Sequence, residues 1–223
     1  TSKRGESSED LIKINDYVYA TSKILNGKES NIIFPWSASS SLDLPNFRFA
    51  SNNKSAIVGH MDFLNGIAVA AGMNFYNVGN GSWDTDYLAK VNKTIELLNN
   101  GYEFVYLHIN GPDEASHAGK LDKKIYSIEQ IDSQIISRLI EYFENNIDEL
   151  GGILATTDHY TNLNAINSER VEAHSIHPVP FVIWNSKEVD KSKSFSESNC
   201  QEGLYGKKIV NHLDILDLLT KNI

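Results

Sequence analysis

Residues 104–117 read FVYLHINGPDEASH. In this stretch an apolar run leads directly into polar residues that are able to bind metal. The run Phe104–Ile109 is rich in aromatic and β-branched residues, which favour strands, and its nearly continuous apolar character is typical of a buried strand. Asp113 and His117 follow it closely. We therefore predict a strand here, with a carboxylate and an imidazole placed just beyond its carboxyl end.

The same arrangement recurs later in the chain. The apolar run 152–156 is followed by Asp158 and His159, and His174 lies just before a third apolar run, 179–184. In parallel α/β sheets, functional residues lie in loops beyond the carboxyl ends of the strands. Two such strands would place four metal-binding side chains at one edge, and His174 would join them from the next loop. Aspartate and histidine together suit zinc, manganese or a similar divalent ion, and a pair of metals suits phosphoryl transfer.

The rest of the chain predicts strands that alternate with helices. Apolar residues recur at helical spacing over 125–142, which indicates a long amphipathic helix. The alternation predicts an α/β fold, with a mostly parallel sheet covered by helices on both faces. The expected strands are 31–36, 54–58, 75–78, 104–109, 152–156 and 179–184, and the expected helices are 9–26, 61–71, 86–98, 125–142 and 214–219.

Composition excludes several classes of protein. With 223 residues, of which 41% are hydrophobic and 22% charged, the chain has the composition of a soluble globular protein with a full core. Its net charge of −9 argues against general binding to nucleic acid or to a membrane surface. No apolar run is long enough to span a membrane, and the first residues contain no signal-peptide core. The single cysteine excludes an internal disulfide framework and favours the reducing cytoplasm.

Each polar segment also has a purely structural interpretation. Carboxylates such as Asp113 favour helix starts, because of the helix dipole, and an Asp-His pair after a strand is a common capping arrangement. The segment 79–82, Gly-Asn-Gly-Ser, is more typical of a tight turn than of a phosphate-binding loop. The side chain of His108 is interpreted as packed, and those of His60, His177 and His212 as surface residues. Cys200 is interpreted as inert, and the serines at 37–41 as a loop. The three polar segments together favour a metal site, whereas residue pattern alone leaves the reaction open.

These segments also resemble the archaeal-type 2,3-bisphosphoglycerate-independent phosphoglycerate mutases, which belong to the alkaline phosphatase superfamily of metalloenzymes. The resemblance covers nearly everything from residue 31 onward and is most specific in the metal motifs. It rests on residues 105–119, 123, 128–132, 157–161 and 173–181, with support from 62–68, 71–73 and 194–197. It implies an alkaline-phosphatase-like core and the interconversion of 3-phosphoglycerate and 2-phosphoglycerate in glycolysis through a phosphoenzyme.

The resemblance also implies metal ligands. Asp113, His117 and His174 match the residues that bind one metal in this family, and Asp158 and His159 match ligands of the second. The expected cofactors are two divalent ions in the full-length protein (Mn²⁺, Zn²⁺, Co²⁺ or Mg²⁺), with one or none in this chain alone. The family completes the second site with an aspartate near its N-terminus and supplies a Ser or Thr nucleophile. Neither has a counterpart in this chain.

We therefore expect part of an enzyme rather than a whole one. Residues 1–30 are expected to be the tail of the family's inserted lid domain or a linker helix, and residues 31–223 the C-terminal part of the phosphatase-like core, which lacks its N-terminal segment. The expected partners are a phosphorylated three-carbon acid and the missing segment of the same protein, with no nucleic acid and no membrane. The chain alone is expected to be inactive. Two alternatives stay open: another phosphotransferase or phosphohydrolase of the superfamily, and a non-catalytic metal-binding domain.

Overall fold

The computed structural model describes residues 8–35, 44, 46–47, 54–146, 151–163, 173–185, 190–206, 208, 210–211 and 214–221. The chain divides into two compact units, Thr1–Asp43 and Leu44–Ile223, which are described separately. The serines at 37–41 and His212 lie outside the described residues. In chain order the elements are α1 (Ser8–Ile24), β1 (Ser55–Gly59), α2 (Asp62–Ala70), β2 (Asn74–Asn77), α3 (Tyr87–Asn99), β3 (Phe104–Leu107), α4 (Gly111–His117), α5 (Leu121–Gln130), the π-helical η1 (Ile131–Ile136), α6 (Ser137–Asn145), β4 (Gly152–Thr156), β5 (Tyr160–Thr161), β6 (His174–Ser175), β7 (Phe181–Asn185), α7 (Glu197–Cys200) and α8 (Ile215–Lys221).

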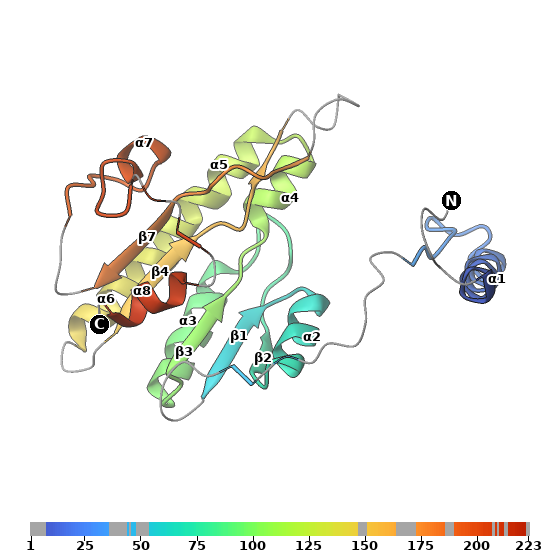
Figure 1. Ribbon diagram of the computed structural model, residues 1–223, viewed down its shortest axis with the longest axis horizontal. Coiled ribbons are helices and arrows are strands. Elements are labelled where there is room, and N and C mark those ends of the chain that lie inside the picture. Colours follow the sequence, from blue (N-terminus) through green and yellow to red (C-terminus); the bar gives the residue numbers. More distant parts are fainter. Residues whose placement is uncertain are drawn as a thin grey trace. The chain divides into compact units, whose positions relative to one another are not determined.

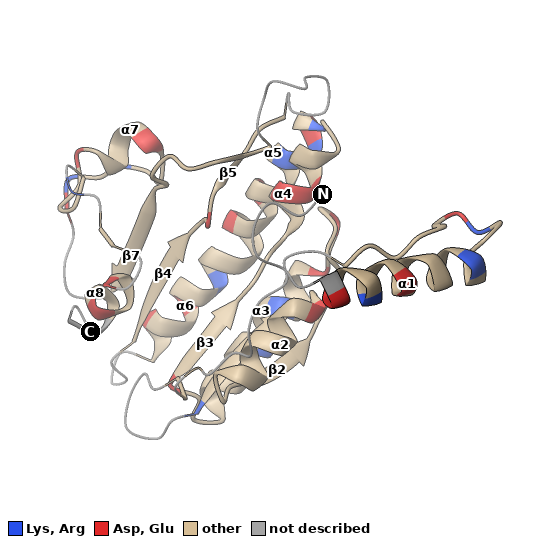
Figure 2. Ribbon diagram, turned by 45° about the vertical axis from the view of Figure 1, so that its right-hand side comes forward, with Lys and Arg blue, Asp and Glu red and all other residues tan. Residues whose placement is uncertain are grey.

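The described part of the first unit contains one helix, α1. Glu9 and Asp10 lie in its first turn and Lys23 in its last, so its charges complement the helix dipole. Acidic and basic residues are interspersed along it (Figure 2), as in a solvated helix. The expected strand at 31–36 is wrong for its described residues, since 31–35 form no strand. An apolar run becomes a strand only where a neighbouring strand supplies partners for its backbone.

The second unit is built on β1, the central strand of a parallel sheet with the order β2-β1-β3. Successive side chains of a strand point to opposite faces of the sheet. Ile57 accordingly packs against Leu64 of α2, whereas Val58 packs against Leu97 of α3. The expected α/β fold, with helices on both faces of parallel strands, is therefore confirmed (Figure 1).

The described strands beyond β3 form two antiparallel pairs, β4 with β7 and β5 with β6. β4 lies beside β3 (Figures 1 and 2), and Ile153 of β4 and Leu107 of β3 pack against the same apolar cluster. The partner of β4 is β7, which runs antiparallel to it with Leu154 opposite Ile183. The short strands β5 and β6 are also antiparallel. An apolar run predicts a buried strand but carries no signal for its direction, which depends on the connections.

A long helical segment covers one side of the second unit. The amphipathic helix expected at 125–142 is confirmed as part of a continuous run formed by α5, η1 and α6. Its buried Ile135 and Leu139 pack against Tyr87 and Val91 of α3. Within the described ranges, no helix is long and apolar enough to cross a bilayer.

Candidate metal centre

The first part of the site lies on α4, the short helix that follows β3. Asp113 and His117 lie four residues apart on this helix, so their side chains project from the same face. Gly111 begins the helix in a buried position. A Cβ at Gly111 would collide with Ser127 Oγ and lie 3.0 Å from Trp83 Cα. Close packing, which only glycine permits, therefore holds the start of α4.

The surroundings of Gly111 are themselves fixed by hydrogen bonds. The hydroxyl of Tyr87 lies 2.6 Å from the Trp83 carbonyl oxygen, to which it donates, and 2.7 Å from Ser127 Oγ. Burial raises the pKa of Tyr87, so this hydroxyl stays protonated. Helices α3 and α5 thereby form a rigid base for the two polar side chains of α4.

The second part of the site comes from the β5–β6 pair. Thr161 of β5 lies opposite His174 of β6 in the antiparallel register. This pairing carries His174 to α4, although 57 residues separate it from His117. Lys124 of α5 donates a hydrogen bond to the carbonyl oxygen of Thr161 over 3.2 Å, which ties the pair to the helical layer.

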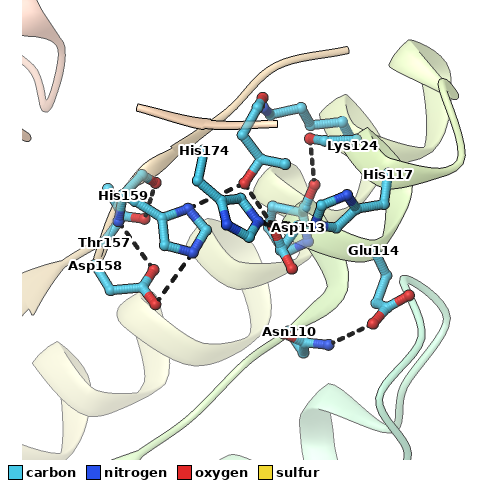
Figure 3. Close-up of polar contacts among 12 residues, drawn as sticks. Asn110, Asp113, Glu114, His117, Lys124, Thr157, Asp158, His159 and His174 are labelled. Atoms are coloured by element: carbon cyan, nitrogen blue, oxygen red, sulfur yellow. Dashed lines mark hydrogen bonds and ion pairs between the residues drawn. The ribbon is translucent and has the colours of Figure 1, made fainter. Parts of the chain in front are cut away.

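Three donor atoms converge where these two parts meet (Figure 3). Nε2 of His117 lies 2.9 Å from Nε2 of His174. Oδ1 of Asp113 lies 3.4 Å from the first of these nitrogens and 3.9 Å from the second. The side chains of His117 and His174 are 40% and 52% exposed, so a ligand in solution can reach them.

This donor set fits a divalent metal. Ligand atoms about 2.1 Å from a tetrahedral zinc ion lie roughly 3.4 Å from one another. The three observed separations, 2.9, 3.4 and 3.9 Å, bracket that value. Two imidazole nitrogens and one carboxylate oxygen suit zinc or manganese better than magnesium, which prefers oxygen alone. Among the described residues, Asp113, His117 and His174 form the one such group of three.

Asp158 and His159 lie beside this group, in the turn after β4. Oδ1 of Asp158 accepts a hydrogen bond from the backbone N–H of His159 over 3.0 Å, and its Oδ2 lies 3.5 Å from His159 Nε2. The centroids of the His159 and His174 rings are 4.1 Å apart. The structure thus brings together all five side chains that the sequence singled out, with Asp158 and His159 as a pair next to the group of three.

Other polar side chains near this edge are engaged elsewhere. Glu114 accepts a hydrogen bond from the side-chain amide of Asn110 over 2.9 Å and belongs to a separate contact (Figure 3). His108 is half-buried, as expected of a packed residue, and burial lowers its pKa, assisted by nearby Lys90 and opposed by Asp158 and Asp113. His60, interpreted as a surface residue, lies with its Nδ1 3.0 Å from Asn77 Oδ1 in an exposed contact.

The glycine-rich segment at 79–82 forms a tight turn, as expected. Gly79 has a φ of +75°, which favours glycine. The backbone N–H of Asn80 donates to Thr85 Oγ1 over 3.0 Å, and the backbone N–H of Ser82 donates to the Asn80 side chain over 2.9 Å. These two backbone N–H groups therefore donate to the side chains of Thr85 and Asn80 instead of to a phosphate.

Sequence reasoning missed two residues of the site, Thr161 and Lys124. The hydroxyl of Thr161 donates to Asp113 Oδ1, and Lys124 anchors the Thr161 backbone. Thr161 follows His159 by two residues, the spacing that returns a side chain to the same face of an extended segment. That period was a usable signal for Thr161. Lys124 had no such signal, since the family resemblance rests on the neighbouring Lys123 instead.

Comparison with known proteins agrees with this geometry. A model of the family described as "Metalloenzyme superfamily" matches residues 35–214. The chain is 31% identical over 230 residues to a 2,3-bisphosphoglycerate-independent phosphoglycerate mutase of Methanosarcina mazei, with 99% of this chain and 55% of that protein covered. It is 33% identical over 195 residues to the protein of the same name from Methanothrix thermoacetophila, with 86% of this chain and 47% of that protein covered.

A solved structure shares the fold. The structure of the PH0037 protein from Pyrococcus horikoshii superposes with a TM-score of 0.58 at 27% sequence identity, covering 75% of this chain and 48% of that one. The chain therefore spans about half the length of the relatives it resembles, with the resemblance to phosphoglycerate mutases confirmed. On the family match over 35–214 and the shared fold, this chain belongs to the metalloenzyme superfamily.

Proposed function

We propose that this chain is the metal-binding part of a 2,3-bisphosphoglycerate-independent phosphoglycerate mutase. Asp113, His117 and His174 bind one divalent ion, and Asp158 with His159 contributes ligands to a second. The observation that carries the proposal is the convergence of three donor atoms from α4 and β6, separated by 2.9 to 3.9 Å. The relatives named as this mutase supply the reaction class.

Each side chain has a task in this proposal. When bound, the metals supply positive charge that offsets the phosphate and lowers the pKa of an attacking hydroxyl. Asp113, His117 and His174 hold that charge at an exposed edge, where a phosphorylated three-carbon acid can approach. Asp158 and His159 lie beside His174 and contribute ligands to the second metal, which would lower the pKa of the attacking hydroxyl. The full reaction moves the phosphoryl group from the 3-oxygen of glycerate to the protein and then to the 2-oxygen.

The activity of the chain by itself is part of the proposal. A complete site needs a hydroxyl nucleophile and a further aspartate, and the resemblance assigns neither to these residues. The purified 223-residue chain therefore binds metal but does not isomerise 3-phosphoglycerate, whereas the longer parent protein does. The composition of this chain, with one cysteine, suits a cytoplasmic location.

Metal binding is tested by equilibrium dialysis against Zn²⁺ or Mn²⁺, with elemental analysis of the bound ion. Asp113→Asn removes the charge of the carboxylate at almost constant volume and should abolish binding at the first site. Asp122→Asn is the matched control, because Asp122 has a 75% exposed side chain on α5 and pairs only loosely with Lys123, at 3.6 Å. Equal metal content in both variants would contradict the ligand assignment.

The reaction is tested separately on the parent protein. A coupled assay for 2-phosphoglycerate should detect isomerisation by the parent and none by this chain. The family match is to a whole superfamily of metalloenzymes, so another phosphotransferase or phosphohydrolase is the second candidate. Release of inorganic phosphate from a panel of phosphate esters, without isomerisation of phosphoglycerate, would favour that candidate.

A further inference from the structure

One side chain, Thr161, contacts both groups of proposed ligands. Its hydroxyl donates to Asp113 Oδ1 and lies 3.2 Å from Nδ1 of His159. Oδ1 is also the Asp113 atom nearest to the two Nε2 atoms of the first site. Thr161 is 8% exposed, so solvent does not compete effectively for these contacts.

Counting protons assigns the direction of both hydrogen bonds. A hydroxyl has one proton to donate, and an ionised carboxylate only accepts. The proton of Thr161 is therefore committed to Asp113. The contact with His159 then requires the imidazole to donate from Nδ1, since two acceptors facing each other over 3.2 Å would repel.

This assignment selects one tautomer of His159. With the proton on Nδ1, the lone pair of the neutral ring lies on Nε2, and a metal binds the nitrogen that carries the lone pair. Nε2 of His159 lies 3.5 Å from Oδ2 of Asp158, which is too long for a good hydrogen bond, so this carboxylate does not claim the ring proton. These two atoms are the ones proposed to serve the second site. A metal-binding histidine usually donates its other N–H to such a partner, which fixes the ring orientation.

The position of Thr161 is itself restrained from two sides. Its pairing with His174 in the β5–β6 register keeps it beside a ligand of the first site. Lys124 Nζ donates to its carbonyl oxygen over 3.2 Å, which anchors the backbone to α5. The hydroxyl is therefore held in place by its backbone before any metal arrives.

We propose that Thr161 is a positioning residue shared by both metal sites, orienting Asp113 Oδ1 for one and fixing the Nδ1–H tautomer of His159 for the other. The proposal rests on the metal-binding function given above. It predicts that the two sites are coupled, because the loss of one hydroxyl leaves an acceptor at Asp113 and a donor at His159 without a partner.

Three variants of the 223-residue chain test the coupling. Thr161→Val removes the hydroxyl at constant shape, and Thr161→Ser restores it. Thr156→Val is the matched control, because Thr156 Oγ1 lies within hydrogen-bond distance of the carbonyl oxygens of Thr157 and Pro180, neither of which is a proposed ligand. Calorimetric titration with Zn²⁺ and with Mn²⁺ should show affinity lowered about 10- to 100-fold by Thr161→Val. Thr161→Ser and Thr156→Val should stay close to the unaltered chain.

A second measurement needs no metal. In the metal-free chain at neutral to alkaline pH, ¹⁵N–¹H correlations of the histidine rings should show His159 as the Nδ1–H tautomer. Thr161→Val should shift this ring toward the Nε2–H form, and Thr161→Ser should not. Since tautomers are read directly from ring nitrogen shifts, a merely structural role of Thr161 would leave this signal unchanged.

The outcomes separate the two proposals. If the unaltered chain binds no metal, the proposed function fails, while the tautomer of His159 still decides the role of Thr161. An Nε2–H tautomer in the unaltered chain would overturn the positioning role, whatever the metal result. Affinity unchanged by Thr161→Val, or lowered equally by Thr156→Val, would overturn it as well. If Thr161→Val does not fold, the tautomer of His159 in the unaltered chain still decides the role of Thr161.

Discussion

The two halves of the candidate metal centre are held by different means. The packed half is α4 with Asp113 and His117, and its first residue, Gly111, is buried against side chains of α3 and α5. The paired half is β5 with β6, two strands of two residues each, which present Thr161 and His174. Close packing resists deformation, whereas a ladder of two residues opens at little cost. The metal site therefore depends on the core on one side and on a few hydrogen bonds on the other.

The largest effect is expected in the packed half, from Gly111→Ala. The new Cβ would collide with Ser127 Oγ, and overpacking of this kind costs about 1–3 kcal/mol of unfolding free energy. Gly66→Ala is the control, because a Cβ at Gly66 has open space and lies in α2, where alanine gains about 0.5–1 kcal/mol. Urea unfolding followed by circular dichroism measures both. Equal stability of the two variants would mean that α4 is not held by packing.

The next effect concerns the paired half and tests whether metal ties it to α4. At a free Zn²⁺ concentration ten times the Kd, binding should stabilise the closed ladder by about 1.4 kcal/mol. Hydrogen exchange of the amides at 160–161 and 174–175 should slow about tenfold to match. Chelation should reverse the slowing. The same slowing in Asp113→Asn would show that the metal binds elsewhere.

A smaller effect, on the pH dependence of the free energy of unfolding, is expected from the buried Lys90 of α3. Lys90 is 1% exposed, its Nζ donates to the His108 carbonyl oxygen over 3.2 Å, and burial lowers its pKa from 10.5 to about 8. Between these values the unfolded chain binds more protons than the folded chain, so stability rises with pH. The rise amounts to about 1 kcal/mol between pH 8 and 9.

Urea unfolding at a series of pH values measures this slope. Lys90→Met should abolish the rise, because no titrating group remains at that position. Lys93→Met, on the same helix, is the control, since Lys93 pairs with Glu96 at the surface over 2.6 Å. Contributions of the tyrosines are common to all three chains and cancel in the comparison. Parallel slopes for Lys90→Met and the unaltered chain would refute the assignment.

The smallest effect is expected from Lys124→Met, which removes the anchor of the paired half. The lost hydrogen bond to Thr161 should speed exchange at 160–161 by the equivalent of about 0.5–1.5 kcal/mol, with little change in global stability. Lys123→Met is the neighbouring control, because Lys123 is 46% exposed and contacts Asp122. If both variants speed exchange equally, the anchor does not act through Thr161.

Much of the fold could be predicted because its signals are local. The helical spacing of Ile135 and Leu139 reflects burial, which a sequence records residue by residue. The run Phe104–Ile109 predicted the strand β3, but the expectation that this strand is buried is wrong, because its residues are partly exposed and Tyr106 is 44% exposed. The run at 31–36 failed in its described part, 31–35, because a strand also needs a partner strand, and no local pattern supplies one. The antiparallel direction of β7 was equally invisible, since side-chain alternation is the same in both directions.

The chain's own residue order determined which side chains could bind metal and that Asp113 and His117 would share a helical face, because four residues complete about one turn. Only the tertiary structure decided that His174 reaches them, since the β5–β6 register, and not sequence distance, sets it opposite Thr161. The same holds for the link from Asp113 through Thr161 to His159. A hydrogen bond depends on atoms within about 3 Å in space, which separation along the chain does not encode.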